Sequence, residues 1–210
     1  MPRKVDIQHY EKQRAGIAEA VWRLAARAGL ESVSMRGVAA EAGVSNGRVQ
    51  YYFPNKDAML LYGLQLAQRR MERRVQQRLE ELPEPVDGES VLRAVLDEML
   101  GDDPDTQQVI RVSLAYHGRA LEDPYVAQLL MGDDAELLTH AASVVRKAKA
   151  DPRTPPGVDP EKEARIIWSL ASSLATEIAF GQLSTQDARA TMHYYLDRIL
   201  VGEAGTTANL

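Results

Sequence analysis

The chain has 210 residues, 45% hydrophobic and 26% charged, which suits one large or two small globular domains, and its formal net charge of −5 argues against a general affinity for polyanions. The absence of cysteine excludes disulfides and thiolate chemistry and fits a cytoplasmic protein. No run of about 20 apolar residues is present, and none follows the basic N-terminal residues, so we expect neither a membrane span nor a signal peptide.

Helical periodicity dominates the first part of the chain, and strand patterns are rare. Gly29 ends a first long helix, and Gly43 ends a shorter second one. Ser34 and Ser45 stand where N-cap residues are expected, before the second and third helices. The predicted helices cover residues 10–28, 35–42, 45–53 and 56–82.

The rest of the chain is also predicted to be helical. A linker at residues 82–88 and a Pro- and Gly-rich break at residues 150–160 interrupt it. The further predicted helices cover residues 89–101, 105–121, 124–149, 161–181 and 185–201. We therefore expect an all-α fold, with a three-helix head in residues 1–56 joined by the long fourth helix to a larger helical body in residues 57–210.

The second and third predicted helices, with the tight turn at Gly43 between them, form a helix-turn-helix pattern supported by the first helix. A rotation of about 100° per residue puts Val49 and Phe53 on one stripe of the third helix, which would face the core. The outward face then carries the following residues: Gly47, Arg48, Tyr51 and, at its edge, Gln50.

These outward residues have the chemistry of a DNA-reading surface. Arginine and glutamine make bidentate contacts with guanine and adenine edges, glycine lets a backbone approach closely, and a tyrosine hydroxyl suits a phosphate oxygen. Ser34 and Ser45 lie at helix N-termini, which favour phosphate, and Lys56 lies just past the turn. The alternative is that the stretch from Gly43 to Lys56 is an ordinary solvated turn.

The distribution of charge favours the DNA-binding interpretation. Residues 1–56 carry nine Lys and Arg against five Asp and Glu, a net charge of +4. Residues 57–210 carry sixteen against twenty-five, a net charge of −9. A basic head on an acidic body is typical of a chain whose first quarter meets a polyanion.

Residues 14–62 resemble the TetR family of bacterial transcriptional regulators. The resemblance is carried by "SMRGVAAEAGVSNGRV" and "YYFPNKDAMLL", with the family's Ala–Gly–Val–Ser at residues 42–45. Gln50 stands where the family usually has tyrosine, and Tyr52 where it usually has histidine. The resemblance implies phosphate contacts for Tyr52 and Lys56, and the departure makes Gln50 a candidate base reader. The alternative for Tyr51 or Tyr52 is that the ring simply lies on the surface or packs on the first helix. The predicted DNA-binding residues are Ser34, Arg36, Ser45, Asn46, Gly47, Arg48, Gln50, Tyr51, Tyr52 and Lys56.

The resemblance also implies that the body binds a small-molecule effector and forms a homodimer through the last two long helices. Residues 166–176 contain no charged side chain, and a helix that is apolar nearly all round must be covered on two sides. One cover would be its own bundle and the other a partner subunit. An ordinary core within one chain is the alternative.

Candidate pocket residues are large or polar side chains on otherwise apolar helices, which either line a ligand site or belong to the core. An unpaired Glu177 would be costly to bury, so it faces solvent, pairs across the dimer or meets a cationic ligand. The candidates are Tyr116, His117, Met131, Trp168, Glu177 and Phe180.

We therefore expect a ligand-responsive repressor that is released from a near-palindromic double-stranded DNA operator when a small molecule binds its C-terminal domain. The four histidines have no metal-ligand spacing, and no phosphate-binding glycine motif or nucleophile elbow is present, so we expect no metal, cofactor or enzymatic activity. Two alternatives are an all-α binding protein that has lost DNA binding and a helical enzyme acting near His117 and Glu177.

Overall fold

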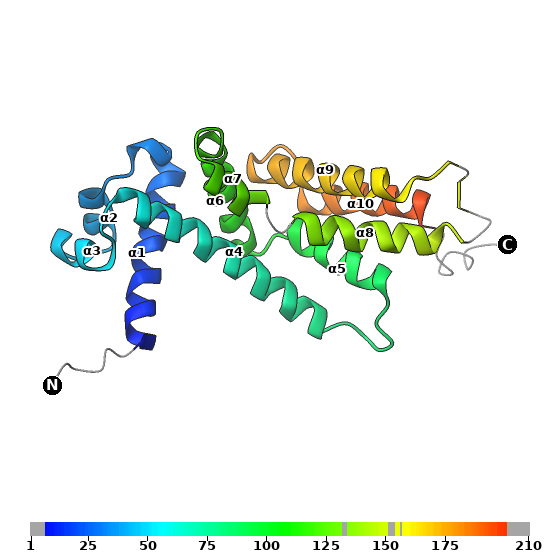
Figure 1. The fold of residues 1–210 in the computed structure, drawn as a ribbon, viewed down its shortest axis with the longest axis horizontal. Helices are drawn as coiled ribbons and strands as arrows, with labels where there is room; N and C mark the ends of the chain where they lie inside the picture. Colours follow the sequence, from blue (N-terminus) through cyan, green and yellow to red (C-terminus); the bar gives the residue numbers. More distant parts are fainter. Residues whose placement is uncertain (1–6, 132–133, 151–153, 156, 201–210) are drawn as a thin grey trace. The chain divides into compact units, whose positions relative to one another are not determined.

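The computed structural model describes residues 7–131, 134–150, 154–155 and 157–200, without the side chains of 131 and 134 (Figure 1). The described residues form helices and no strand, which confirms the all-α prediction. None of these helices is long and apolar enough to cross a membrane. The elements are α1 (Ile7–Ala28), the short 3-10 helix η1 (Leu30–Ser32), α2 (Met35–Glu41), α3 (Asn46–Tyr52), α4 (Lys56–Glu80), α5 (Gly88–Met99), α6 (Pro104–Ala120), α7 (Pro124–Met131), α8 (Asp134–Ala148), α9 (Pro160–Ala179) and α10 (Thr185–Ile199).

The predicted helix ends are confirmed in the head. The Ser34 hydroxyl accepts a hydrogen bond from the Gly37 amide, and the Ser45 hydroxyl accepts one from the Arg48 amide. Each such cap stabilises its helix by about 1 kcal/mol. Gly43, after α2, has a φ of 66°, a left-handed conformation that side chains with a Cβ rarely adopt.

One expected helix is wrong. The described residues of the range 124–149 form two helices, α7 and α8, instead of one. The sequence at the junction is Gly132–Asp133–Asp134. Glycine and aspartate are poor residues for a helix interior and favourable ones at helix ends. Apolar periodicity alone therefore overestimated the length of this helix.

The chain divides into two compact units. The first comprises the residues up to Glu72 together with Gln108–Leu130, and the second comprises Arg73–Gln107 together with the residues from Met131 onward. The helices α4, α6 and α7 each contribute to both units. The predicted division at residues 56 and 57 separates DNA binding from ligand binding and stays a prediction.

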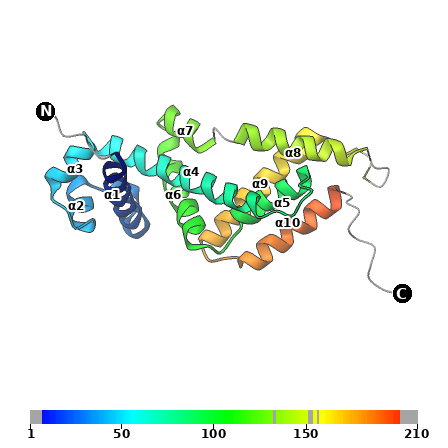
Figure 2. The ribbon, with the colours of Figure 1, turned by 90° about the horizontal axis from the view of Figure 1, so that it is seen from below.

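The first unit is built around α1, whose apolar face is buried against α2, α3 and the first part of α4. Figures 1 and 2 both show α1, α2 and α3 side by side. Two hydrogen bonds from buried side chains join distant segments to α4. The Trp22 indole donates to the Gly63 carbonyl over 3.2 Å, and the Tyr116 hydroxyl donates to the Leu60 carbonyl over 2.5 Å. Burial raises the pKa of Tyr116, so its phenol stays a donor.

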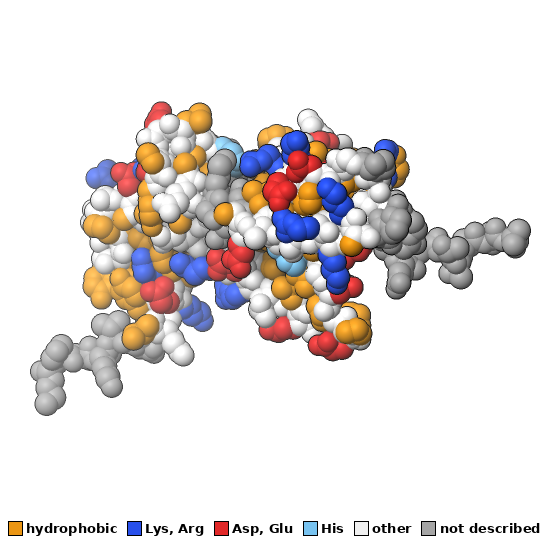
Figure 3. All heavy atoms as spheres, turned by 45° about the vertical axis from the view of Figure 1, so that its right-hand side comes forward, with side chains coloured by type: hydrophobic (Ala, Val, Ile, Leu, Met, Phe, Trp, Pro, Cys, Tyr) orange, Lys and Arg blue, Asp and Glu red, His pale blue; other side chains and the backbone are white. Residues whose placement is uncertain are grey.

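In the second unit, α9 packs against both α8 and α10 and runs antiparallel to each, and α5 lies against α8 (Figure 1). Glu98 is buried in it, where its carboxylate accepts hydrogen bonds from Arg74 over 3.0 Å and from Thr106 over 2.6 Å. Surface charges pair in this unit, as Arg146 does with Glu161. Lys and Arg side chains are interspersed with Asp and Glu side chains on the face drawn in Figure 3.

Candidate nucleic-acid interface

The third helix is fixed from behind by its apolar stripe. Val49 and Phe53 are buried, with exposed fractions of 0% and 1%, as the helical rotation predicts. The turn before α3 is closed by a hydrogen bond from the Val44 amide to the Ala39 carbonyl. The orientation of α3 about its own axis is therefore set by core packing rather than by any DNA contact.

The opposite face of α3 is open to solvent. The side chains of Arg48, Gln50 and Tyr51 are exposed, and Tyr51 is 66% exposed. Gly47 lies among them, and a Cβ added there would meet only the Ser45 hydroxyl, at 4.0 Å. The fold does not need glycine at this position. An external backbone that approaches α3 closely would need it.

The remaining predicted DNA-binding residues differ in their exposure to solvent and in their contacts within the fold. Arg36 on α2 is exposed, while Asn46 is half-buried. Lys56 donates to the Glu31 carbonyl over 3.0 Å. Tyr52 is only 9% exposed, and its ring centroid lies 4.9 Å from that of Tyr10 on α1. Its predicted phosphate contact stays a prediction, and its packing on the first helix is the alternative that the sequence left open for it.

An ion-pair cluster ties α1 to α2. The Glu41 carboxylate accepts hydrogen bonds from both Arg27 and Arg23. Together these bonds lower the pKa of Glu41 from 4.5 to about 2, with the bond from Arg27 contributing most and that from Arg23 next. Two cations of the basic head are thus paired within the fold, so the excess of positive charge is not all directed at a partner.

Family comparisons match both parts of the chain. A model of bacterial regulatory proteins of the tetR family matches residues 17–62, the helix-turn-helix and its supports. A model of the C-terminal part of BetI-type transcriptional repressors matches residues 88–201, more than half of the chain. This chain belongs to the TetR family. It is a transcriptional regulator of the BetI type, and its relatives are regulators rather than enzymes.

Individual relatives agree with this membership. The regulator BetI from Burkholderia cenocepacia is 29% identical over 198 residues, which are 92% of this chain and 96% of that protein. The regulator PksA from Bacillus subtilis is 39% identical over 75 residues, which are 36% of this chain and 35% of that protein.

Solved structures share the TetR fold. A TetR-like transcriptional regulator from Rhodococcus sp. RHA1 aligns with a TM-score of 0.71 at 20% identity, covering 97% of this chain and 100% of that chain. A protein from Saccharomonospora viridis, solved in complex with choline, aligns with a TM-score of 0.73 at 21% identity, covering 89% of this chain and 96% of that chain. At these identities the likeness concerns the fold alone.

The predicted pocket residues lie in different surroundings. In the first unit, Tyr116 is buried and bonded to α4, while His117 is exposed with its ring Nδ1 2.9 Å from the Ser113 carbonyl oxygen. In the second unit, α9 carries a half-buried Trp168 and a half-buried Glu177, and the C-cap residue Phe180 is 67% exposed. The side chain of Met131 lies outside the described residues. The ligand role of this set stays a prediction.

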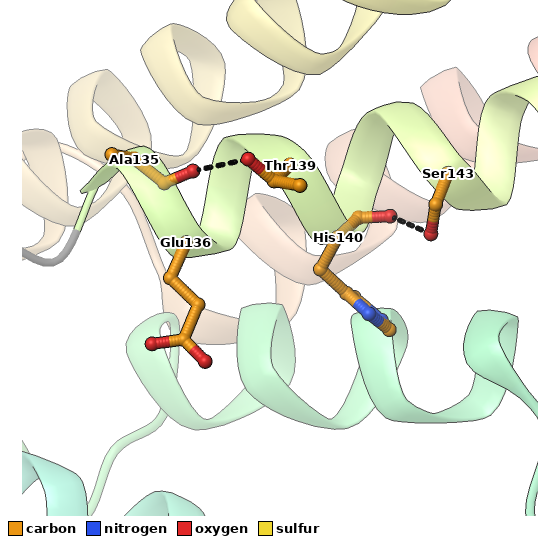
Figure 4. Close-up of a pocket in the computed structure, with 5 residues that line it drawn as sticks. All are labelled: Ala135, Glu136, Thr139, His140 and Ser143. Atoms are coloured by element: carbon orange, nitrogen blue, oxygen red, sulfur yellow. Dashed lines mark hydrogen bonds between the residues drawn. The ribbon is translucent and has the colours of Figure 1, made fainter.

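A surface hollow of about 560 Å³ lies along α8 and does not include these residues. Figure 4 shows Glu136 and His140 projecting from α8 toward α5, and the His140 Nε2 lies 3.0 Å from the Gly88 carbonyl oxygen. The lining residues are Ala135, Glu136, Thr139, His140 and Ser143. All five come from one helix, so among the described residues the hollow lacks the converging walls of a ligand site. Within the part of the chain that the structure describes, no cluster of acidic and histidine side chains could hold a metal ion.

Proposed function

We propose that this TetR-family protein acts in the cytoplasm as a homodimeric repressor that leaves a near-palindromic operator when a small molecule binds its C-terminal domain. The observation that carries the proposal is the solvent-exposed face of α3, with Arg48 and Gln50 on either side of a Gly47 that the fold itself does not require. Such a helix, held from behind by buried residues, is suited to enter a major groove.

The proposed DNA contacts divide into base readers and phosphate contacts. Arg48 would contact guanine and Gln50 adenine, each through a bidentate pair of hydrogen bonds. Tyr51, with its exposed ring, would reach a phosphate oxygen. The phosphate contacts fix the position of the head without selecting a sequence. The other proposed positioning residues are Ser34, Arg36, Ser45, Asn46, Tyr52 and Lys56.

The proposed dimer interface uses α9 and α10. One face of α9 is buried in its own unit, through Ile167, Leu174 and Ile178. Its opposite face has Ile166, which is 46% exposed, and Phe180. Between these two, the uncharged Ser169, Leu170, Ser173 and Thr176 lie on the same side of the helix. The patch is uncharged from Ile166 to Thr176, and Glu177, which is bonded to Ser173, lies on the same side at its end. A largely uncharged patch on a helix is typical of a surface that another subunit covers.

Effector release would follow a population shift. The effector would favour a body conformation in which the two heads no longer match successive major grooves, which are about 34–36 Å apart. Choline is the first compound to test, because one structural neighbour was solved with choline bound. Glu177, which accepts a hydrogen bond from Ser173, is the one acidic group among the predicted pocket residues. It would pair with a cationic effector or across the dimer.

The central experiment is a selection of bound fragments from genomic DNA, followed by titration of the purified chain against the recovered site. We expect a near-palindromic site, two protomers per site, and an affinity that falls steeply as salt is raised, because each phosphate contact releases counterions. Absence of binding, or an affinity that does not change with salt, would contradict DNA binding by this chain.

A substitution tests the dimer separately. Ile166→Glu should give monomers in sedimentation and weaken operator binding, because a charge would be buried in the interface. Val86→Glu is the matched control, since Val86 is 41% exposed in the same unit and lies outside α9 and α10. A dimer that persists in Ile166→Glu would contradict the assignment of the interface to α9.

A further inference from the structure

The N-terminal part of α1 lies against the flank of α3 that carries the proposed DNA contacts. Tyr10 and Gln13 are three residues apart and so share one side of α1, while Arg48, Tyr51 and Tyr52 share one side of α3. Every one of these five residues contacts another across the two helices. Figure 2 shows α1 and α3 next to each other in the first unit.

Gln13 contacts the arginine that would read a base. The Arg48 guanidinium donates from Nη2 to the Gln13 side-chain oxygen over 3.2 Å. Arg48 is exposed and Gln13 is half-buried, so the contact joins a mobile group to a more restrained one. A guanidinium has five N–H donors, so one bond to Gln13 leaves enough donors for a bidentate contact with guanine. Ordering the side chain before binding reduces the entropy that is lost when DNA binds.

Tyr10 restrains the neighbouring tyrosines of α3 by packing against their rings. Its ring centroid lies 4.9 Å from that of Tyr52 and 6.3 Å from that of Tyr51. Tyr51 and Tyr52 meet edge to face, with centroids 5.0 Å apart. The Arg14 guanidinium lies over the Tyr10 ring, 5.7 Å from its centroid. The rings of Tyr10, Tyr51 and Tyr52 thus form one cluster, in which Tyr10 belongs to α1 and Tyr51 is exposed.

We infer that Gln13 and Tyr10 are positioning residues that help determine DNA specificity, acting through Arg48 and Tyr51. Both lie before residue 17, where the match to the family's helix-turn-helix model begins. Part of the specificity would therefore be set outside the matched motif. This inference rests on the proposed function of α3, and it adds the residues that orient the proposed DNA-contacting side chains of that helix.

The test is a double-mutant cycle with Gln13→Ala, Arg48→Ala and the double variant, measured on the selected operator and on a library of single base-pair changes. Gln13→Ala should weaken operator binding about fivefold and flatten the base preference at the same positions that Arg48→Ala flattens. In the Arg48→Ala background, Gln13→Ala should change the affinity by less than about twofold. A merely structural role would instead weaken all sequences equally and add to the effect of Arg48→Ala.

Controls separate the inference from the proposed function. Gln77→Ala removes an exposed helical glutamine on α4 and should leave both affinity and base preference unchanged. If Arg48→Ala weakens binding but Gln13→Ala does not, or the two effects add, the inference is wrong and base reading by Arg48 stands. If Arg48→Ala has no effect, base reading by Arg48 is wrong.

A second pair of variants tests the tyrosine cluster. Tyr10→Phe keeps the ring contacts and should bind the operator like the unmodified chain, while Tyr10→Ala removes them and should weaken binding about fivefold. Adding Tyr10→Ala to Tyr51→Ala should then have little further effect. Equal losses from Tyr10→Phe and Tyr10→Ala would overturn positioning by the ring, because only the hydroxyl is absent from phenylalanine.

Discussion

Gly47→Ala should separate fold stability from DNA binding. The added Cβ would meet only the Ser45 hydroxyl at 4.0 Å, which is ordinary contact, so the folded chain has room for it. Alanine is favoured over glycine within a helix by up to about 1 kcal/mol, so stability should rise slightly. On the DNA side, the Cβ adds about 1.5 Å between α3 and any backbone in close approach. That distance is enough to break a bidentate base contact worth about 1–3 kcal/mol, or roughly 5- to 150-fold in affinity.

The assay pairs thermal unfolding with fluorescence anisotropy on the selected operator at fixed salt. Gly118→Ala is the matched control, because Gly118 is an exposed glycine of α6 whose added Cβ would meet nothing within 4 Å. Gly118→Ala should share any gain in stability and leave the affinity unchanged. Operator binding by Gly47→Ala that equals that of the control would refute a close approach of DNA to this face of α3.

Three further substitutions test the fold around the head. The lowered pKa of Glu41 means that its carboxylate stabilises the fold above pH 4.5, and that this stabilisation is lost as the carboxylate is protonated between pH 4.5 and about pH 2. In denaturant titrations, Glu41→Gln should therefore lose less stability than the unmodified chain over this pH range. Gly43→Ala should lower the free energy of unfolding by about 1–2 kcal/mol, since φ is 66° there, and an unchanged value would contradict a strained turn. Tyr116→Phe should lower it by about 0.5–1.5 kcal/mol in urea, through loss of the bond to the Leu60 carbonyl.

The order and ends of most helices could be predicted from local chemistry. Ser34 and Ser45 cap their helices, and Gly43 adopts the left-handed conformation that its position after α2 suggests. Apolar periodicity continues across Gly132, so it predicts one helix where the structure has the two helices α7 and α8. Local signals of this kind predict the ends of a helix well when capping residues and apolar periodicity indicate the same boundary, and poorly when they indicate different ones.

The site could be predicted only in part, because helical rotation places a residue relative to its own helix axis. Rotation correctly put Val49 inside and Arg48 outside. It could not tell which other helix lies along each flank of α3. The burial of Tyr52 against Tyr10, and the bond from Arg48 to Gln13, depend on residues about 35 to 42 positions apart in the sequence. A single sequence contains no local signal for such contacts.

The two candidate base readers of α3 are consequently held in different ways. Arg48 and Gln50 lie about 160° apart around the helix axis, so the α1 flank that restrains Arg48 does not reach Gln50. Gln50 is exposed, and within the described residues its side chain has no hydrogen-bond partner. Arg48 would therefore meet DNA with part of its side-chain entropy already lost, while Gln50 would lose its own on binding. A glutamine in the family's usual tyrosine position thus leaves the more adaptable reader on the flank of α3 away from α1.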